Sequence, residues 1–271
     1  MTTVSIVTVC LNDAAGLART IASVARQTFS DYELVVVDGG STDGSVDVVR
    51  ANGAVVTDWV SEKDAGIYDA QNKGVRRARG EWIIFLNAGD ALASDDALAR
   101  FFEGAPAEDV LYGDVVWEEK DGRRRVDAQP DVLTLEFFMR TNLPHQATAV
   151  RRALLERLGR YDTELRIAAD YEFLLRSIVV HGATTRHVPV SLAVQVTGGL
   201  SSRPESFASL RAERKLAREK ALSPLLREHW QAHLEAKRGP IVHFARTAFR
   251  PAARRLRRLS RALRGKPDAD D

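Results

Sequence analysis

Acidic and amide side chains occur at three places where an apolar run of this sequence ends. Asn12 and Asp13 follow the first run, Asp38 ends the second, and Asn87 and Asp90 follow the run WIIFL. In an open parallel sheet, ligands bind outside the carboxyl ends of the strands, where the loops leave the sheet. One acid at such a place is usually a helix cap or a turn residue. Three such places in series predict a single binding site along one edge of a sheet.

The elements that would position these side chains alternate between strand and helix in the first half of the chain. Short apolar, β-branched runs indicate strands, and apolar residues at helical spacing indicate helices. Strands that are apolar on both faces and separated by helices indicate a parallel sheet covered on both sides, so we predict an α/β fold with a mainly parallel central sheet. The predicted strands are 4–11, 34–37, 55–60, 82–86, 110–117 and 187–196, and the predicted helices are 14–27, 45–52, 68–78, 95–102, 153–158 and 171–180, with a hairpin turned at Asp121-Gly122.

Composition and missing motifs exclude several classes of protein. Cys10 is the only cysteine of the 271 residues, so no disulfide can form within the chain, which fits a reducing compartment. The N-terminus has no basic region before its apolar stretch, and no apolar run approaches the ~18 residues of a membrane span, so we expect a cytoplasmic protein. The first predicted strand is followed by CLNDAAG instead of G-x-G-x-x-G, and a G-x-x-x-x-G-K-[ST] loop is absent. A nicotinamide or P-loop triphosphate ligand is therefore not expected.

The C-terminal segment is strongly basic, whereas the rest of the chain is acidic. Residues 236–266 contain eleven Lys or Arg and no acid, and residues 1–235 carry a net charge of −6. We predict a domain of residues 1–205, a helical segment of 206–239 and a basic amphipathic tail of 240–271. Apolar residues at helical spacing among the arginines of the tail favour binding to an anionic membrane surface. The alternatives are a solvated or disordered charged segment and a nucleic-acid-binding tail.

Eight segments, in the same order along the chain, resemble those of the family 2 glycosyltransferases, the inverting enzymes of the GT-A fold. The resemblance covers about residues 4–215. It implies a single Rossmann-like GT-A domain that binds a nucleotide-sugar donor with a divalent metal, Mn²⁺ or Mg²⁺, on the diphosphate. It also implies transfer of a hexosyl group, with inversion, to a hydroxyl of a glycan or lipid-linked acceptor, in cell-surface polysaccharide or glycolipid biosynthesis. The segments are VSIVTVCLN, QTFSDYELVVVDGGSTDGS, SEKDAGIYDAQNKG, GEWIIFLNAGD, YGD, LPHQATAVRRALLERLGRYD, AADYEFLLR and GGLSS.

The resemblance also implies which residues bind the nucleoside. Asp38 resembles the acid that contacts it, and Glu62, Asp64 and Asp69 fall in the segment that resembles the wall facing the nucleotide. Many relatives have a second acid where this chain has Gly39, so the base of the donor stays open. The alternative for Asp69 is an acid that interacts with a helix dipole.

The run NAGD, residues 87–90, occupies the place of the family's D-x-D motif. Asn87 replaces the first acid, so Asp90 is the predicted metal ligand and Asn87 a predicted ligand of the donor. Mg²⁺ or Mn²⁺ would bridge the two phosphates and take up charge as the nucleoside diphosphate leaves. His145 and Asp114 are further candidates near the diphosphate. The alternatives are a turn residue at Asp90 and a structural histidine at 145.

Asp170, in the segment AADYEFLLR, resembles the family's catalytic base. Inverting transfer needs one base that removes the proton from the acceptor hydroxyl. The helix predicted after Asp170 would leave it at an exposed N-terminal end, where a helix cap is the competing role. Glu172 would point away from Asp170 and is the poorer candidate.

Two other classes of function remain open. The missing first acid of D-x-D suggests a nucleotide-sugar-binding protein without turnover, and the tail suggests a nucleic-acid-associated protein. Asp170 and Asp90 favour the enzyme, and the acidic body argues against nucleic acid, which is not expected as a partner.

Overall fold

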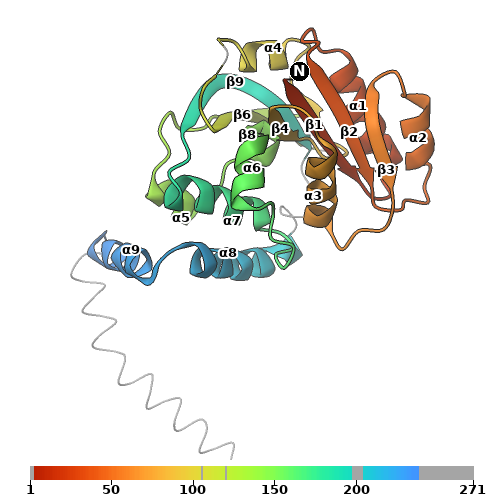
Figure 1. The fold of residues 1–271 in the computed structure, drawn as a ribbon. Coiled ribbons are helices and arrows are strands. Elements are labelled where there is room, and N and C mark those ends of the chain that lie inside the picture. The colour runs from red at the N-terminus through yellow and green to blue at the C-terminus, as the bar shows by residue number, and fades with distance from the viewer. Residues whose placement is uncertain (1–2, 105, 120, 197–203, 238–271) are drawn as a thin grey trace, which may run out of the picture. The chain divides into compact units, whose positions relative to one another are not determined.

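The chain divides into two compact units, Met1–Ala221 and Leu222–Asp271. The computed structural model describes residues 3–104, 106–119, 121–196 and 204–237 (Figure 1). The first unit contains the sheet and extends beyond the boundary at residue 205 that the sequence suggested. In the second unit, helix α9 (Pro224–Lys237) is described, and the predicted tail of 240–271 lies outside the described residues. None of the described helices has the length and apolar character that crossing a membrane requires.

A nine-stranded sheet forms the centre of the first unit (Figure 1). Its first half is the parallel arrangement β3-β2-β1-β4. Every residue of β1 and β4 is buried, as expected for strands covered on both faces. All four strands were predicted from the sequence; their bounds are β1 (Val4–Cys10), β2 (Tyr32–Asp38), β3 (Val56–Ser61) and β4 (Trp82–Phe85).

Three helices cover the two faces of this parallel half. Leu17 of α1 packs in one apolar cluster with Ile6 of β1, and the next residue of a strand points to the opposite face. Helix α3 packs on β1 at that opposite face, where a Cβ at Gly74 would lie only 2.2 Å from Cγ1 of Val7. Glycine is therefore required for this close approach of helix and strand. The three helices are α1 (Ala14–Ala25), α2 (Ser45–Ala51) and α3 (Ile67–Arg77).

The second half of the sheet is mixed, so the prediction of a parallel sheet holds for the first half of the chain only. Strand β8 is antiparallel to both β4 and β6, and β6 is parallel to β9. Strands β5 and β7 pair antiparallel with β9 and β6, and β7 completes the predicted hairpin. The direction of a strand is not encoded in its residue types, which explains the difference. The bounds are β5 (Ala91–Leu92), β6 (Val110–Glu118), β7 (Arg124–Asp127), β8 (Thr148–Arg151) and β9 (Thr185–Val196).

The sequence did not predict β5, β8 or helix α5. Strand β8 has four residues, of which only Ala149 and Val150 are apolar, so it shows no alternation. The predicted helix 171–180 consists of α7 followed by a π-helical segment, Leu175–Val180. The remaining helices are α4 (Ala97–Phe101), α5 (Leu135–Arg140), α6 (Arg152–Leu158), α7 (Ala169–Leu174) and α8 (Phe207–Ala221), with 3-10 turns at His145–Ala147 and Pro204–Ser206.

Candidate active site

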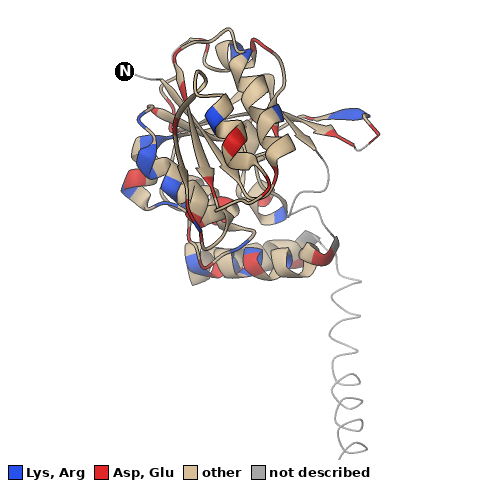
Figure 2. Cartoon of the chain, turned by 90° about the vertical axis from the view of Figure 1, so that its right-hand side faces the viewer, with Lys and Arg blue, Asp and Glu red and all other residues tan. Residues whose placement is uncertain are grey.

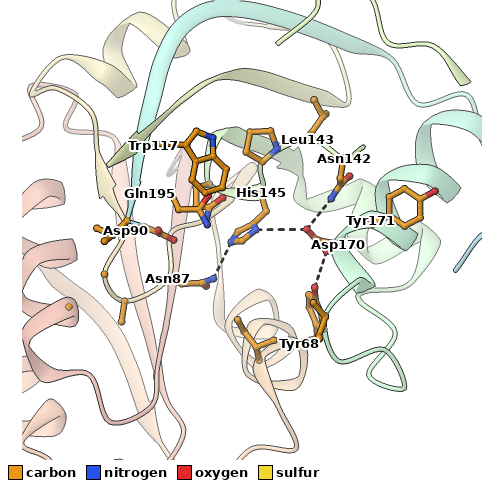
Figure 3. Close-up of a pocket in the computed structure, with 18 of the residues that line it drawn as sticks. Tyr68, Asn87, Asp90, Trp117, Asn142, Leu143, His145, Asp170, Tyr171 and Gln195 are labelled. Carbon is orange, nitrogen blue, oxygen red and sulfur yellow. Dashed lines mark hydrogen bonds and ion pairs between the residues drawn. The ribbon is translucent and has the colours of Figure 1, made fainter. Parts of the chain in front are cut away.

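A pocket of about 790 Å³ opens beyond the carboxyl ends of β1 and β4 (Figure 3). The loop after β4 contributes Asn87 and Asp90, the segment before β8 contributes Asn142 and His145, and α7 contributes Asp170. Four of the residues predicted from the sequence therefore meet in one cavity: Asn87, Asp90, His145 and Asp170.

Asp170 lies in the first turn of α7, and two side chains bind its carboxylate. Tyr68 Oη donates to Oδ1 over 2.8 Å, and Asn142 Nδ2 donates to Oδ2 over 3.0 Å. The N-cap of α7 is Ala168, so the competing view of Asp170 as the cap is wrong. Burial, followed by the charge of Asp170, raises the pKa of Tyr68 well above its usual value. Tyr68 thus stays protonated and donates to the Asp170 carboxylate.

Glu172, the poorer candidate, is used elsewhere. Its Oε1 accepts a hydrogen bond of 2.7 Å from Arg176 Nε one turn along the helix. Only 6% of its side chain is exposed, and it does not line the pocket.

A chain of polar contacts connects the loop after β4 to Asp170. Gln71 Nε2 donates to Asn87 Oδ1 over 3.1 Å, which turns the Asn87 amide nitrogen toward His145 Nε2, 3.0 Å away. His145 Nε2 then accepts, and Nδ1 carries the proton and lies 3.8 Å from Asp170 Oδ2. Burial lowers the pKa of His145, although the charge of Asp170 opposes this effect. We therefore describe His145 as a neutral imidazole of fixed tautomer.

Asp90 is a buried carboxyl, with 8% of its surface exposed. Burial raises its pKa to about 7, while a hydrogen bond from Gln146 and the charge of Arg19 act in the opposite direction. The loop around it is fixed by Thr20, whose hydroxyl donates to the Asp90 carbonyl over 2.7 Å and accepts from the Gly89 amide. Gly89 has a φ of 95°, which favours glycine at this position.

The acidic groups of the pocket fit a metal ion whose coordination shell is completed by a bound ligand, and not one held by protein side chains alone. Among the described residues, no group of three His, Cys, Asp or Glu side chains could hold a metal ion. Asp13, the other acid near this loop, caps α1 by accepting from the Gly16 amide. Mg²⁺ needs only one or two carboxylates when phosphate oxygens and waters complete its shell. Asp90 meets that minimum, since its carboxyl group lines the pocket.

The predicted nucleoside-binding residues form a second group that does not line the pocket. Asp38 is fully buried, and its Oδ2 accepts hydrogen bonds from the Gly40 and Ser41 amides and the Ser61 hydroxyl. Its Oδ1 is buried and has no hydrogen-bond partner in the described part of the chain. Asp64 lies beside Gly39. A Cβ atom added to residue 39 would be only 2.5 Å from Asp64 Oδ2.

Glu62 and Asp69 share one cation. Lys73 Nζ lies 3.0 Å from Glu62 and 3.5 Å from Asp69, and Asp69 also accepts from the Ala65 amide at the start of α3. Asp114 is also outside the pocket, where its Oδ1 contacts His187 Nε2 at 3.1 Å and accepts from the Gln129 amide. Glu62, Asp69 and Asp114 thus each have a structural contact within the protein.

Several residues that line the pocket or support it from behind were not singled out in the sequence. Tyr68, Gln71 and Asn142 bind the predicted residues directly, yet each lies in a segment read only as helix or loop. Trp117 and Gln195 reach the pocket from β6 and β9 (Figure 3). The sequence offered one signal for some of these residues: they lie in IYDAQNKG and LPHQ, which are parts of the segments that resemble the family.

Comparison with known proteins identifies the family. The profile of glycosyl transferase family 2 matches residues 5–157, more than half of the chain. The chain belongs to glycosyl transferase family 2. A family member from Mycobacterium bovis (strain BCG), named a PGL/p-HBAD biosynthesis glycosyltransferase, is 37% identical over 205 residues, which cover 73% of this chain and 78% of the relative.

Solved structures place this family 2 chain in the GT-A fold, as predicted. Residues 1–349 of S. aureus TarS in complex with UDP-GlcNAc superpose with a TM-score of 0.64 at 19% identity, covering 82% of this chain and 68% of that fragment. The mannosyltransferase PcManGT from Pyrobaculum calidifontis, solved with GDP-Man and Mn²⁺, gives 0.60 at 20% identity, covering 81% of this chain and 64% of that one. The family and fold expected from the eight segments are thus confirmed, and the chain is a glycosyltransferase.

Proposed function

We propose that this glycosyltransferase moves a hexosyl group from a nucleotide-diphosphate sugar to a hydroxyl of a glycan or lipid-linked acceptor, with inversion at the anomeric carbon. The observation that carries the proposal is the Asp170 carboxylate, which lines the pocket and is oriented by Tyr68 and Asn142. A cell-surface glycolipid or polysaccharide is the expected product, which agrees with the name of the mycobacterial relative.

Asp170 acts as the catalytic base. Inversion in one step requires a single base on the acceptor side, which removes the hydroxyl proton as the oxygen attacks. Tyr68 and neutral His145 are not competitors, because the raised pKa of Tyr68 keeps it protonated and the His145 Nε2 lone pair faces Asn87. The two hydrogen bonds to Asp170 fix its oxygens while leaving lone pairs for the acceptor.

Asp90, Asn87 and His145 bind the diphosphate part of the donor. A divalent cation, Mn²⁺ or Mg²⁺, would be held by Asp90 and would neutralise charge on the leaving diphosphate. Asn87 would donate its second amide hydrogen to the sugar-phosphate, and His145, whose Nε2 accepts the first one, would orient that amide at the same site. We assign the nucleoside to Asp38, Glu62, Asp64 and Asp69, a proposal supported by the unpartnered Oδ1 of Asp38, which could accept from a base or ribose.

The tail of residues 240–271 is proposed to bind the inner face of an anionic membrane, with the enzyme otherwise in the cytoplasm. The support is the sequence alone, with its arginines set around an apolar stripe. Such a location would bring the pocket near lipid-linked acceptors.

The experiment is a donor screen by mass spectrometry with Mn²⁺ and a panel of nucleotide sugars, followed by turnover measurements on Asp170→Asn. We expect the variant to bind the donor as well as the unmodified protein and to lose about 10²–10⁴-fold in kcat, the contribution of a general base. Tyr68→Phe, which keeps the carboxylate, should lose much less. If Asp170→Asn retained a tenth of kcat, Asp170 would not be the base. Donor binding with no turnover of any panel member would favour a binding protein instead.

A further inference from the structure

The pocket has a second charged end, formed by α8 and the segment that precedes α7. Arg214 of α8 and Arg166 both line the cavity, beside Tyr171. In Figure 3, Asp90 and Tyr171 lie on opposite sides of the pocket, with Asp170 between them. The end that contains Tyr171 therefore lies beyond the base as seen from the proposed diphosphate site.

Arg214 stacks on an aromatic ring and forms no ion pair with a carboxylate of the described residues. Its guanidinium carbon lies 5.3 Å from the centroid of the Tyr171 ring, and its Nε is buried with no hydrogen-bond partner among the described residues. Burial raises the pKa of Tyr171, and the positive charges of Arg218 and Arg214 oppose that effect. Asn142 Oδ1 is a second buried atom without a partner at this end, since Asn142 uses its Nδ2 for Asp170.

The neighbouring acid does not neutralise these arginines. Glu213 Oε2 accepts hydrogen bonds of 2.7 Å and 3.1 Å from the backbone amides of Ile167 and Ala168, so its charge fixes the segment just before Asp170. Arg19, Arg77, Arg152 and Arg176 each pair with a carboxylate, whereas no described carboxylate forms an ion pair with Arg214 or Arg166. Acids and bases are otherwise interspersed in the view of Figure 2.

Buried polar groups without partners are costly, so an unpaired Arg214 N–H beside the cavity suggests a ligand that accepts from it, and Asn142 Oδ1 could accept from a hydroxyl of the same ligand. A guanidinium binds an oxyanion through two parallel hydrogen bonds, and stacking on an aromatic ring fixes its plane for that purpose. We propose that the acceptor carries an anionic group, a phosphate ester or a carboxylate, which Arg214 and Arg166 bind while Asp170 receives the proton of its hydroxyl. This inference rests on the proposed function, because it assigns the α8 end to the acceptor.

The test uses small anions on the full-length protein. Glycerol 3-phosphate, glycerate and glycerol are titrated by nuclear magnetic resonance, with the donor-site nucleotide present so that the diphosphate site is filled. We expect binding of the charged compounds and not of glycerol, and about tenfold weaker binding to Arg214→Gln and Arg166→Gln, the loss of a charge-assisted hydrogen bond. Comparing the affinities for glycerol 3-phosphate and glycerate shows whether the site prefers a phosphate ester or a carboxylate. Arg211→Gln, an exposed position of the same helix, is the matched control.

Arg214→Lys keeps the charge and should bind more strongly than Arg214→Gln, and thermal unfolding identifies any variant that fails to fold. Equal affinity of unmodified protein and Arg214→Gln, or equal binding of glycerol and glycerol 3-phosphate, would overturn the proposal. Donor binding is measured in parallel: a protein that binds the anions but no nucleotide sugar would refute the proposed function and keep the anion site.

Discussion

Asp90→Asn should stabilise the ligand-free protein at high pH, although Asp90 is the residue we assign to the metal. The carboxyl is buried, and its pKa is raised from 3.8 to about 7 because burial disfavours its charged form. A neutral amide of the same shape escapes this penalty and can still accept from Gln146. The substitution therefore separates the cost of the Asp90 charge to folding from the contribution of that charge to metal binding.

The magnitude follows from linkage. Below about pH 4 the carboxyl is protonated in both the folded and the unfolded protein and contributes no difference. Between about pH 4 and 7 the unfolded chain loses the proton while the folded protein keeps it, so stability falls as pH rises, by about 1.4 kcal/mol per unit. Above about pH 7 the penalty is constant, at up to about 4 kcal/mol for this shift.

Urea denaturation at several pH values, with a chelator present, measures the effect. The difference in unfolding free energy between Asp90→Asn and the unmodified protein should be near zero at about pH 4 and rise to a plateau above about pH 7. Asp95→Asn, which removes one exposed ion pair with Arg26, is the control and should change stability by less than about 1 kcal/mol at every pH. A difference that did not vary with pH, or a destabilised Asp90→Asn at about pH 8, would refute the reasoning.

Two further predictions concern the metal and the tail. Asp90→Ala should abolish metal-dependent donor binding in a Mn²⁺ titration, whereas Asn87→Ala should weaken it less, because the carboxylate supplies charge and the amide only orientation; equal, small losses would place the metal elsewhere. Truncation after Gly239 should leave a folded, donor-binding protein that no longer sediments with anionic vesicles, and full-length binding should weaken as salt rises, since charge attraction is screened within ~10 Å at 0.1 M. Serine at Leu256, Leu259 and Leu263 should weaken vesicle binding at constant net charge, and unchanged binding would contradict an amphipathic helix in the tail.

The parallel half of the fold could be predicted because its signals are local. Strands β1 to β4 are short apolar runs, and α1 to α3 repeat apolar residues at helical spacing, so each element is encoded within its own segment. Strand β8 could not be found in this way, because its burial comes from β4 and β6 on either side. The same holds for β5, two residues that pair with β9 about a hundred positions later.

The same distinction between local signals and long-range contacts applies to the residues of the site. Asn87, Asp90, His145 and Asp170 could be named because strand ends and motif positions mark them, and the pocket brings them together. Their partners could not, because a tyrosine at the start of a helix carries no sign that it will donate to an aspartate 102 positions away. Asp38 and Asp64 were named for a nucleoside, and that assignment stays a prediction.

The sequence predicts Asn87 at the place of the first D-x-D acid, and an amide there fits the contacts of this pocket. Asn87 Nδ2 lies 3.0 Å from His145 Nε2, where a carboxylate would attract a proton onto the imidazole and so place a cation 3.8 Å from Asp170. A protonated His145 would lower the proton affinity of that carboxylate, which the proposed chemistry requires as a base. A second acid beside buried Asp90 would also raise its pKa further and hinder metal binding at neutral pH. An amide at residue 87 avoids both effects, and in the proposed mechanism the missing negative charge would come from the phosphates of the donor.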